Sequence, residues 1–481
     1  MNNSYLKNVV IVGGGPAGLG AALMLAKRGW QDIIVLEKRP SADYYEPDKS
    51  FSYQIDGRGQ KLTDFLGLTS QLADLSVPST EFYLTLIKKD GTRKTSKLPI
   101  ADPNRKTAYW LPRASFVQLL YQEIEQNWSD SIQVFFQTQC VEIQRNQEYL
   151  EIIAQLPDEK QLTFTPTLLV GCDGLNSIVR QTLHQWEQRK SHNFQMQQFP
   201  SPSSGLKYKV LTLPPQFPLS EREGDLAQST MAYAIRSTLT GRKKAISLGL
   251  LPLKDPSQPR TANIITYPDH QIWQLKTQEE VTHFLKQAFP QISLEQIISP
   301  EEIARFAASE GGTFPIPQYC SRLYQIWGQP QANQGTAVIL LGDAVHCFPP
   351  DIGQGVNSAL EDVYLFQETL AETQDNLSQA LPRYESLRQP DIRALIRLVQ
   401  ISYPWQYNQA PFQKRLWSLN FFLRFVLSRI FPFLFNPHSF LLIQNHELSY
   451  SKILELSNRT TQVLFILGGL VILTLLFNLL T

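Results

Sequence analysis

Short apolar runs of strand length occur on both sides of a small-residue segment near the start of the chain. Residues 8–12 and 33–36 are dominated by Val, Ile and Leu, and residues 16–28 between them are rich in Ala, Leu and Gly. A short apolar run is typical of a buried strand, and the Ala/Leu-rich segment is typical of a helix. The pattern predicts a strand–helix–strand unit of a parallel sheet.

Further elements follow along the chain. Residues 114–126 have a helical pattern, and residues 132–170 alternate like the strands of an accessory sheet that ends in the apolar run 168–170. Prolines become frequent from about residue 200. The strand-like runs beyond that point, which predict a second domain built on an antiparallel sheet, are 207–213, 231–235, 245–250 and 262–267, with a helix near 278–288. An apolar strand at 337–341 returns the chain to the first domain, and the sequence beyond Pro390 is helical.

The C-terminal residues 463–480 are almost entirely apolar. As a helix they would span roughly 27 Å, close to the hydrocarbon thickness of about 30 Å. Lys452 and Arg459 precede this run, which predicts a membrane helix with the body of the protein on the cytoplasmic side. A buried terminal helix is the alternative. The amphipathic stretch 414–430 is expected either at the membrane interface or packed on the first domain.

Charge and cysteine content narrow the function classes. The formal net charge is +1, so the chain has no basic excess that would favour a nucleic-acid partner. The four cysteines are scattered, and neither a CxxC pair nor a suitably spaced histidine predicts a metal site.

Gly13-Gly14-Gly15-Pro16-Ala17-Gly18 follows the first predicted strand and opens the first helix. Glycines allow a backbone to approach a pyrophosphate, and the helix N-terminus supplies free N–H groups and partial positive charge. Glu37 ends the second strand, 19 residues after Gly18, where a carboxylate can accept ribose hydroxyls. Strand, glycines, helix and acid together predict a dinucleotide site.

Two later motifs complete a pattern. Gly171-Cys172-Asp173-Gly174 follows an apolar strand and precedes Arg180, and Gly342-Asp343-Ala344-Val345-His346 is followed by Pro349-Pro350 and by Gly353-Gln354-Gly355-Val356-Asn357. Asp343 could bind a ribityl hydroxyl, and the 353–357 run can open a helix whose N–H groups face the pyrimidine end of a flavin. His346 alone is more typical of a packed histidine than of a catalytic one.

In this order the three motifs resemble the single-component FAD-dependent aromatic hydroxylases, the flavoprotein monooxygenases, over residues 8 to about 395. Within that class the chain is most similar to the kynurenine 3-monooxygenases, on the run 51–59, the run 387–391 and the aromatic, helical C-terminus. The resemblance implies an α/β chain with a Rossmann-type FAD-binding domain, an inserted antiparallel-sheet substrate domain and a helical C-terminus that ends in a membrane helix. The expected parts are the FAD-binding domain (1–72, 98–200 and 335–390), the substrate domain (73–97 and 201–334), the helical region (391–460) and the membrane helix (461–481).

The resemblance also implies the chemistry and its residues. FAD would be reduced by NAD(P)H, and oxygen would then form a flavin 4a-hydroperoxide that hydroxylates a small-molecule substrate. The residues expected at FAD are Gly13, Gly15, Ala17, Gly18, Glu37, Lys38, Arg39, Gln54, Arg113, Cys140, Asp173, Asp343, Gly355, Val356 and Asn357. The loop residues expected at the reacting face of the flavin are Pro349, Pro350, Gly353 and Gln354.

The substrate positions depart from the family pattern. The family holds a substrate carboxylate with an Arg and a Tyr, and these positions fall on Phe82, beside Tyr83, and on Ile100. An expected Asn is Ser402, and a C-terminal Tyr aligns as Tyr450. Without the Arg a buried carboxylate would be unpaired. We therefore expect a lipophilic aromatic or isoprenoid-like substrate rather than free kynurenine.

Two other functions remain open. One is a membrane-associated flavin reductase, dehydrogenase or epoxidase that acts on a lipid, because related folds carry the same FAD motifs. The other is a membrane-anchored FAD-binding protein without turnover, against which the intact 349–355 loop argues.

Overall fold

In the computed structural model, the chain is described over residues 8–49, 51–97, 105–187, 191–220, 222–407 and 409–480. Its central layer is a six-stranded sheet of order β20-β21-β12-β1-β2-β8, parallel except for the β20–β21 pair. The strands are β1 (Val9–Val12), β2 (Ile33–Leu36), β8 (Ile132–Phe135), β12 (Leu168–Gly171), β20 (Tyr324–Gln329) and β21 (Gln334–Leu340). The strands β1 and β12 are buried along their whole length, which explains why their sequences are continuous apolar runs.

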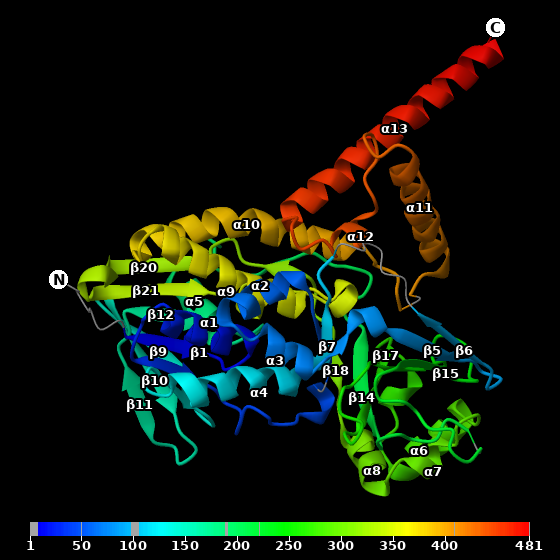
Figure 1. The fold of residues 1–481 in the computed structure, drawn as a ribbon, viewed down its shortest axis with the longest axis horizontal. Helices are drawn as coiled ribbons and strands as arrows, with labels where there is room; N and C mark the ends of the chain where they lie inside the picture. The colour runs from blue at the N-terminus through cyan, green and yellow to red at the C-terminus, as the bar shows by residue number, and fades with distance from the viewer. Residues whose placement is uncertain are drawn as a thin grey trace.

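Helices cover this sheet on both faces (Figure 1). The helices of this part of the chain are α1 (Pro16–Lys27), α2 (Gly57–Leu66), α3 (Thr69–Asp74), α4 (Arg113–Glu123), α5 (Ile178–Trp186), α9 (Gly355–Glu372) and α10 (Leu377–Ile401). The helix α1 packs against both α4 and α9, and α9 also packs against α2 and α10. The predicted helix 114–126 is α4 followed by a π-helical turn, Ile124–Trp128.

The predicted accessory sheet over 132–170 is only partly confirmed. Strand β8 joins the edge of the central sheet, whereas β9 (Gln139–Asn146), β10 (Tyr149–Gln155) and β11 (Gln161–Phe164) form a separate antiparallel sheet. The first apolar run of the predicted accessory sheet therefore belongs to the central six-stranded sheet. The remaining small sheets are β3 (Ser52–Ile55), β7 (Tyr109–Pro112) and β4 (Val77–Pro78), and β13 (Gln197–Gln198), β19 (Gln318–Tyr319) and β22 (His346–Cys347).

A second, seven-stranded sheet has the order β18-β14-β17-β16-β15-β5-β6 and is antiparallel except for the β15–β5 pair. Its strands are β5 (Tyr83–Ile87), β6 (Arg93–Lys97), β14 (Lys207–Leu213), β15 (Ala232–Arg236), β16 (Ser247–Leu250), β17 (Arg260–Thr266) and β18 (Gly312–Thr313). Burial alternates along β17, so one face of this sheet carries its own apolar core. The helices beside this core are α6 (Gln278–Ala288), α7 (Leu294–Ile297) and α8 (Pro300–Ala308).

Three helices end the chain: α11 (Pro411–Ile430), α12 (Ser439–Leu442) and α13 (Tyr450–Leu480). Figure 1 shows α13 starting beside α10 and running away from the body, with α11 next to it. Buried Arg424 joins the two helices, because its guanidinium donates to Ser457 O at 3.1 Å and to Thr461 Oγ1 at 2.8 Å. Residues 414–430 were predicted to lie at a membrane interface or to pack on the first domain. The contacts of Arg424 instead pack α11 against α13, and Leu416, Leu419 and Leu423 are exposed.

The predicted membrane-spanning helix over 461–481 is not supported. Within the part of the chain that the structure describes, no helix is both long enough and apolar enough to cross a membrane. The predicted segment is not a separate helix but the continuation of α13, whose first three turns carry Lys452, Glu455 and Arg459. Thr481 and most side chains beyond Leu470 lie outside the described part.

Candidate flavin site

The three sequence motifs follow three neighbouring strands. In the register of the central sheet, Val12 of β1 lies beside both Leu36 of β2 and Gly171 of β12, and Gly171 lies beside Leu340 of β21. Each motif begins at or just beyond these positions, so all three meet at the carboxyl edge of the sheet. Ligands of open parallel sheets bind at this edge.

The glycine loop between β1 and α1 is shaped for close approach by a ligand. Gly13 has a φ of 105°, and a Cβ there would lie 2.4 Å from the carbonyl oxygen of Cys172. Gly15, by contrast, faces open space, where a Cβ would meet no atom within 4 Å. The helix α1 starts at Pro16 without a side-chain cap. Its N-terminal N–H groups therefore face the opening, as a bound pyrophosphate requires.

Glu37 closes the loop from the side of β2. Its carboxylate accepts the N–H of Gly14 at 2.7 Å and that of Arg39 at 2.8 Å, and the Arg39 guanidinium lies 3.7 Å away. Glu37 is only 4% exposed, so these donors take the place of water as partners of its carboxylate. Lys38 points to solvent, and Ala17 and Gly18 are buried in the first turn of α1. The structure thus brings the predicted adenosine-end residues together.

The second motif fixes backbone rather than presenting a free acid. One oxygen of Asp173 accepts the N–H of Ile178 at 2.6 Å at the start of α5. The other oxygen has no hydrogen-bond partner among the described residues. Arg180 donates to Leu175 O and to Ala344 O, both at 2.9 Å, and so ties this motif to the third. Cys140 lies on β9, and burial, together with the charge of Asp173, raises the pKa of its thiol to about 12.

Asp343 follows β21 and is exposed to solvent between buried Gly342 and Ala344. Its side chain is accessible to solvent, yet desolvation by surrounding protein raises its pKa. The pKa of Tyr53 is also raised by burial, with opposing effects of Arg113 and Asp343, so these side chains lie within electrostatic range of one another. Gln54, on the same strand β3, accepts through its backbone oxygen from Asn357 at 2.8 Å. An exposed acid with protein close around it can offer a carboxylate to a polar cofactor.

The third motif ends in a loop that opens α9. Asn357 is fully buried, and its amide donates to Gly353 O at 3.1 Å while its oxygen accepts the N–H of Asp56 at 3.0 Å. Gly355 faces open space, and Val356 is buried behind it. Pro349 is buried and Pro350 is exposed. The uncapped N-terminus of α9 is therefore held rigidly with free N–H groups, which suits the electron-rich end of a flavin.

A cavity of about 430 Å³ lies between α4 with the start of β3 on one side and the seven-stranded sheet on the other. Phe51, Ser52 and Arg113 line it from the first domain, and Thr212 and Arg260 line it from the second sheet. The volume falls within the range of small-molecule pockets, roughly 300–1,000 Å³. It adjoins Arg113, so a molecule in it would be near the predicted cofactor.

Each predicted substrate residue that the structure describes has its own set of contacts. Phe82 is half-buried with its ring 5.3 Å from that of Trp110, and neighbouring Tyr83 is 38% exposed beneath Lys97. Ile100 lies outside the described residues. Ser402 is fully buried and bonds Ser439 at 3.0 Å. Tyr450 is also fully buried, and its hydroxyl donates to Gln354 at 2.7 Å.

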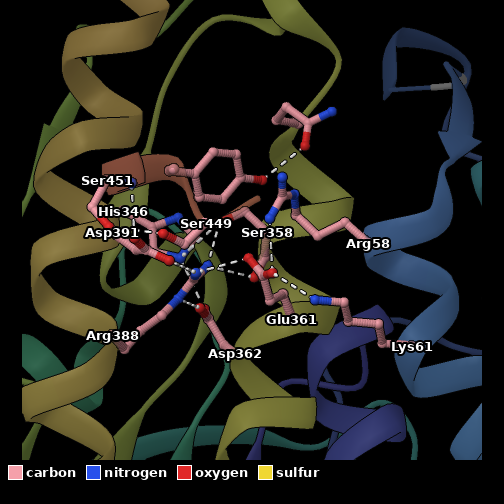
Figure 2. A network of polar contacts seen from close by, with 12 residues as sticks. Arg58, Lys61, His346, Ser358, Glu361, Asp362, Arg388, Asp391, Ser449 and Ser451 are labelled. Atoms are coloured by element: carbon pink, nitrogen blue, oxygen red, sulfur yellow. Dashed lines mark hydrogen bonds and ion pairs between the residues drawn. The ribbon is translucent and has the colours of Figure 1, made fainter. Parts of the chain in front are cut away.

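Sequence reasoning missed a buried ionic network behind this site (Figure 2). Arg58 and Arg388 both pair with Glu361 at 2.9 Å, and Arg388 also pairs with Asp362. Asp362 in turn accepts from Gly342 N at 2.7 Å and bonds His346 at 2.8 Å. The sequence favoured a packed rather than a catalytic histidine at position 346, and the complete burial of His346 in this network agrees with that. In the sequence, the run 387–391 is the one sign that charged residues matter here. It does not indicate that Arg388 pairs with Glu361 and Asp362.

Comparisons with known proteins agree with this geometry. A family described as FAD binding domain matches residues 7–207 and 329–399, more than half of the chain. Kynurenine 3-monooxygenase from Sus scrofa is 24% identical over 402 residues, covering 82% of this chain and 75% of the relative. Violacein synthase from Chromobacterium violaceum is 25% identical over 407 residues, covering 83% and 85%.

The solved structure of 2-methyl-3-hydroxypyridine-5-carboxylic acid oxygenase is similar with a TM-score of 0.59 at 16% identity, covering 84% of this chain and 92% of that one. This likeness concerns the fold. The predicted mixed α/β FAD-binding fold is confirmed by these matches and by the sheet described above.

Proposed function

Because the chain belongs to the FAD-dependent monooxygenases that carry this FAD-binding domain, we propose that it uses NAD(P)H and oxygen to hydroxylate a lipophilic aromatic or isoprenoid-like substrate. The observation that carries this proposal is the convergence of three motifs at one sheet edge, with open space above Gly15 and Gly355. A non-catalytic binding protein would have no need for the rigid, uncapped loop at the N-terminus of α9.

FAD, when bound, supplies the redox chemistry, and the protein positions and shelters it. The loop around Gly15 and the carboxylate of Glu37 would hold the adenosine diphosphate portion. Asp343 would bind the ribityl chain, and the N-terminus of α9 would face the pyrimidine ring. The strands that end at this sheet edge are buried, so water does not reach the site through the sheet.

The expected substrate lacks a free carboxylate near Phe82. This side chain stands where the resembling enzymes have an Arg, and it packs against Trp110 rather than against a charged group. Burying apolar substrate surface against these two rings would contribute about 25 cal/mol of binding free energy for each Å². The equal likeness to violacein synthase, at 25% identity, agrees with a substrate other than kynurenine.

Stopped-flow reduction of the FAD-loaded protein by NADH and by NADPH, without oxygen, tests the co-substrate. Reduction by either within seconds supports the proposal, and reduction by neither contradicts it. With oxygen, we expect peroxide release and no product from kynurenine. Tight coupling of NAD(P)H oxidation to kynurenine hydroxylation would refute the substrate assignment.

Incorporation of labelled oxygen distinguishes a monooxygenase from a dehydrogenase. A panel of lipophilic phenols, quinols and isoprenoid alcohols would be incubated with NAD(P)H and ¹⁸O₂. A product that gains one ¹⁸O atom supports the proposal. A desaturated or reduced product without the label would favour the lipid dehydrogenase or reductase.

We also propose that the C-terminal helices attach the protein to a lipid bilayer, with the body on the cytoplasmic side. Large apolar side chains face solvent on α11, in the loop after it and on α13: Phe412 (67% exposed), Leu419 (67%), Phe422 (62%), Phe433 (72%) and Phe465 (76%). Exposed Arg415 and Arg429 on α11 would favour anionic lipid.

Flotation with vesicles of phosphatidylcholine and phosphatidylserine at 4:1 tests this attachment. We expect the double variant Leu419→Glu/Phe422→Glu to bind at least about tenfold more weakly, because each side chain contributes roughly 1.5–3 kcal/mol when buried. Leu226→Glu is the control, since Leu226 is 46% exposed but lies in the second domain. Equal flotation of all three proteins would contradict the proposal.

A further inference from the structure

The side chain of Gln354 is held at both ends of its amide. It lies in the loop that opens α9 and is only 4% exposed. Its Nε2 donates to Asp56 Oδ2 at 2.8 Å, and its Oε1 accepts from the hydroxyl of Tyr450 at 2.7 Å. An amide with a fixed donor and a fixed acceptor has one orientation. The backbone on either side, Gly353 and Gly355, would otherwise be the most adaptable part of the loop.

Tyr450 reaches this loop from almost a hundred residues further along the chain. It is the first residue of α13 and is completely buried. The Arg58 guanidinium lies 4.1 Å from the centre of its ring and donates to Leu448 O at 2.9 Å. The N–H of Ser451 donates to Asp391 on α10 at 2.9 Å. The start of α13 is therefore built into the first domain.

The same ionic network supports both ends of this contact. Figure 2 shows Arg388 directed at Glu361 and Asp362, with Arg58 on the other side of Glu361. Both arginines are fully buried, so each depends on its carboxylate partners. Asp56, which receives the Gln354 amide, also caps α2 by accepting the N–H of Arg58 at 2.9 Å. The anchoring groups on each side of Gln354 are thus rigid, and the Tyr450 hydroxyl completes the arrangement.

We propose that Tyr450 is a positioning residue for the flavin reaction: through its hydroxyl it fixes Gln354, and thereby the loop 353–355 at the flavin. This inference rests on the proposed function, because it takes that loop to face the bound flavin. Among the described residues, the hydroxyl makes one hydrogen bond, to Gln354. Its effect passes through the Gln354 side chain alone, and this distinguishes it from general packing of the C-terminal helix.

Tyr450→Phe in the full-length, FAD-loaded protein is the direct test. The variant keeps the ring over Arg58 and removes one hydrogen bond. Tyr384→Phe is a matched control, because Tyr384 is equally buried and lies beside Arg388, but its hydroxyl has no hydrogen-bond partner among the described residues. Both variants are expected to fold and to retain FAD.

The readouts are the flavin midpoint potential and the rate of anaerobic reduction by NAD(P)H. We expect Tyr450→Phe to weaken the preference for reduced flavin about five- to tenfold, which lowers the two-electron potential by about 20–30 mV. Tyr384→Phe should leave the potential unchanged. Equal potentials in the wild type and both variants would overturn the proposal. The potential can be measured with a chemical reductant, so a protein that NAD(P)H does not reduce refutes the proposed function without preventing this test.

A double-mutant cycle with Gln354→Leu shows whether the effect passes through Gln354. If it does, adding Tyr450→Phe to Gln354→Leu should change the potential by less than a third of its effect in the wild type. Additive effects would show that Tyr450 acts by another route and would also overturn the proposal. The cycle remains decisive even when Tyr450→Phe lowers the overall stability, because the potentials are read only from folded, FAD-loaded protein.

Discussion

Asp351 is a buried carboxyl within the loop that leads to Gly353, and it offers a quantitative test of the structure. It is 3% exposed. Its Oδ1 accepts from Gln406 Nε2 at 3.2 Å, whereas Oδ2 has no well-aligned donor among the described residues. Burial raises its pKa from 3.8 to about 6, against smaller opposing effects of Ser203 and Gln406. We predict that Asp351→Asn stabilises the protein, and more so at higher pH.

The sign follows from proton binding. The folded protein holds the Asp351 proton more tightly than the unfolded chain does, so stability falls as pH rises from about 4 to about 6 and stays lower above that. At about 1.36 kcal/mol for each tenfold change in proton affinity, the ionised carboxyl costs about 3 kcal/mol at pH 7.5. At pH 5 the same relation gives about 1.6 kcal/mol. The stabilisation by Asp351→Asn should therefore shrink by about 1.4 kcal/mol between these two values.

Urea unfolding with saturating FAD, followed by tryptophan fluorescence at pH 7.5 and pH 5, measures this difference. Any effect of the new amide that does not depend on protonation is the same at both pH values, so it cancels in the difference. Asp158→Asn is the control, because Asp158 is exposed and its contact with Lys160 lowers its pKa. This carboxyl is ionised in the folded and the unfolded chain at both pH values, so its effect on stability should be the same at pH 7.5 and pH 5. A stability difference for Asp351→Asn that does not change with pH would refute the reasoning.

Three further predictions follow from the site. Arg388→Met should lower the free energy of unfolding by about 3–5 kcal/mol, because it removes the guanidinium that pairs with Glu361 and Asp362 in the interior. The control Arg383→Met should cost under about 1 kcal/mol at its exposed pair, and equal costs in urea unfolding would contradict this prediction. Glu37→Gln should weaken FAD binding about tenfold in fluorescence titration, since it loses a charge-assisted acceptor for two backbone N–H groups, and unchanged affinity would argue against the role assigned to Glu37. Deleting residues 462–481 should leave FAD bound, whereas a deletion from residue 445 removes Tyr450 and should release it; equal FAD content of the two purified proteins would contradict the contact.

The elements nearest the first motif could be predicted from sequence almost to the residue. The predicted strands 8–12 and 33–36 and helix 16–28 correspond to β1, β2 and α1 with at most one residue of difference. Each of these elements is dictated by local pattern: a fully buried strand is an apolar run, and a helix over a parallel sheet is rich in small residues. The strand-like runs after residue 200 likewise fall on β14 to β17.

The C-terminal region was harder to predict because its pattern is ambiguous. The sequence predicts a helical region over 391–460 followed by a separate membrane helix over 461–481. The structure instead has the short α12, a break, and one helix from Tyr450 to Leu480. The break lets Arg58 bond the carbonyl oxygens of Asn445 and Leu448. A tertiary contact of this kind leaves no periodic signal in the segment that makes it.

The same distinction applies within the candidate site. The residues that would touch FAD lie in motifs because a pyrophosphate and a flavin impose glycines and acids at fixed points after strands. The residues behind them are under no such local constraint. Arg58 and Glu361 are 303 positions apart, and their pairing depends only on α2 and α9 lying side by side.

The buried ionic network also explains why the C-terminal segment is integral to the flavin site. A buried pair of arginines needs both acidic partners and hydrogen-bond acceptors to offset the loss of hydration. Glu361 and Asp362 provide the charge, and one terminal nitrogen of Arg58 also donates to the carbonyl oxygens of residues 445 and 448. Removing that segment would leave guanidinium N–H groups unpaired beside the flavin loop. The segment therefore contributes to the electrostatic balance of the FAD domain, whatever its continuation along α13 binds.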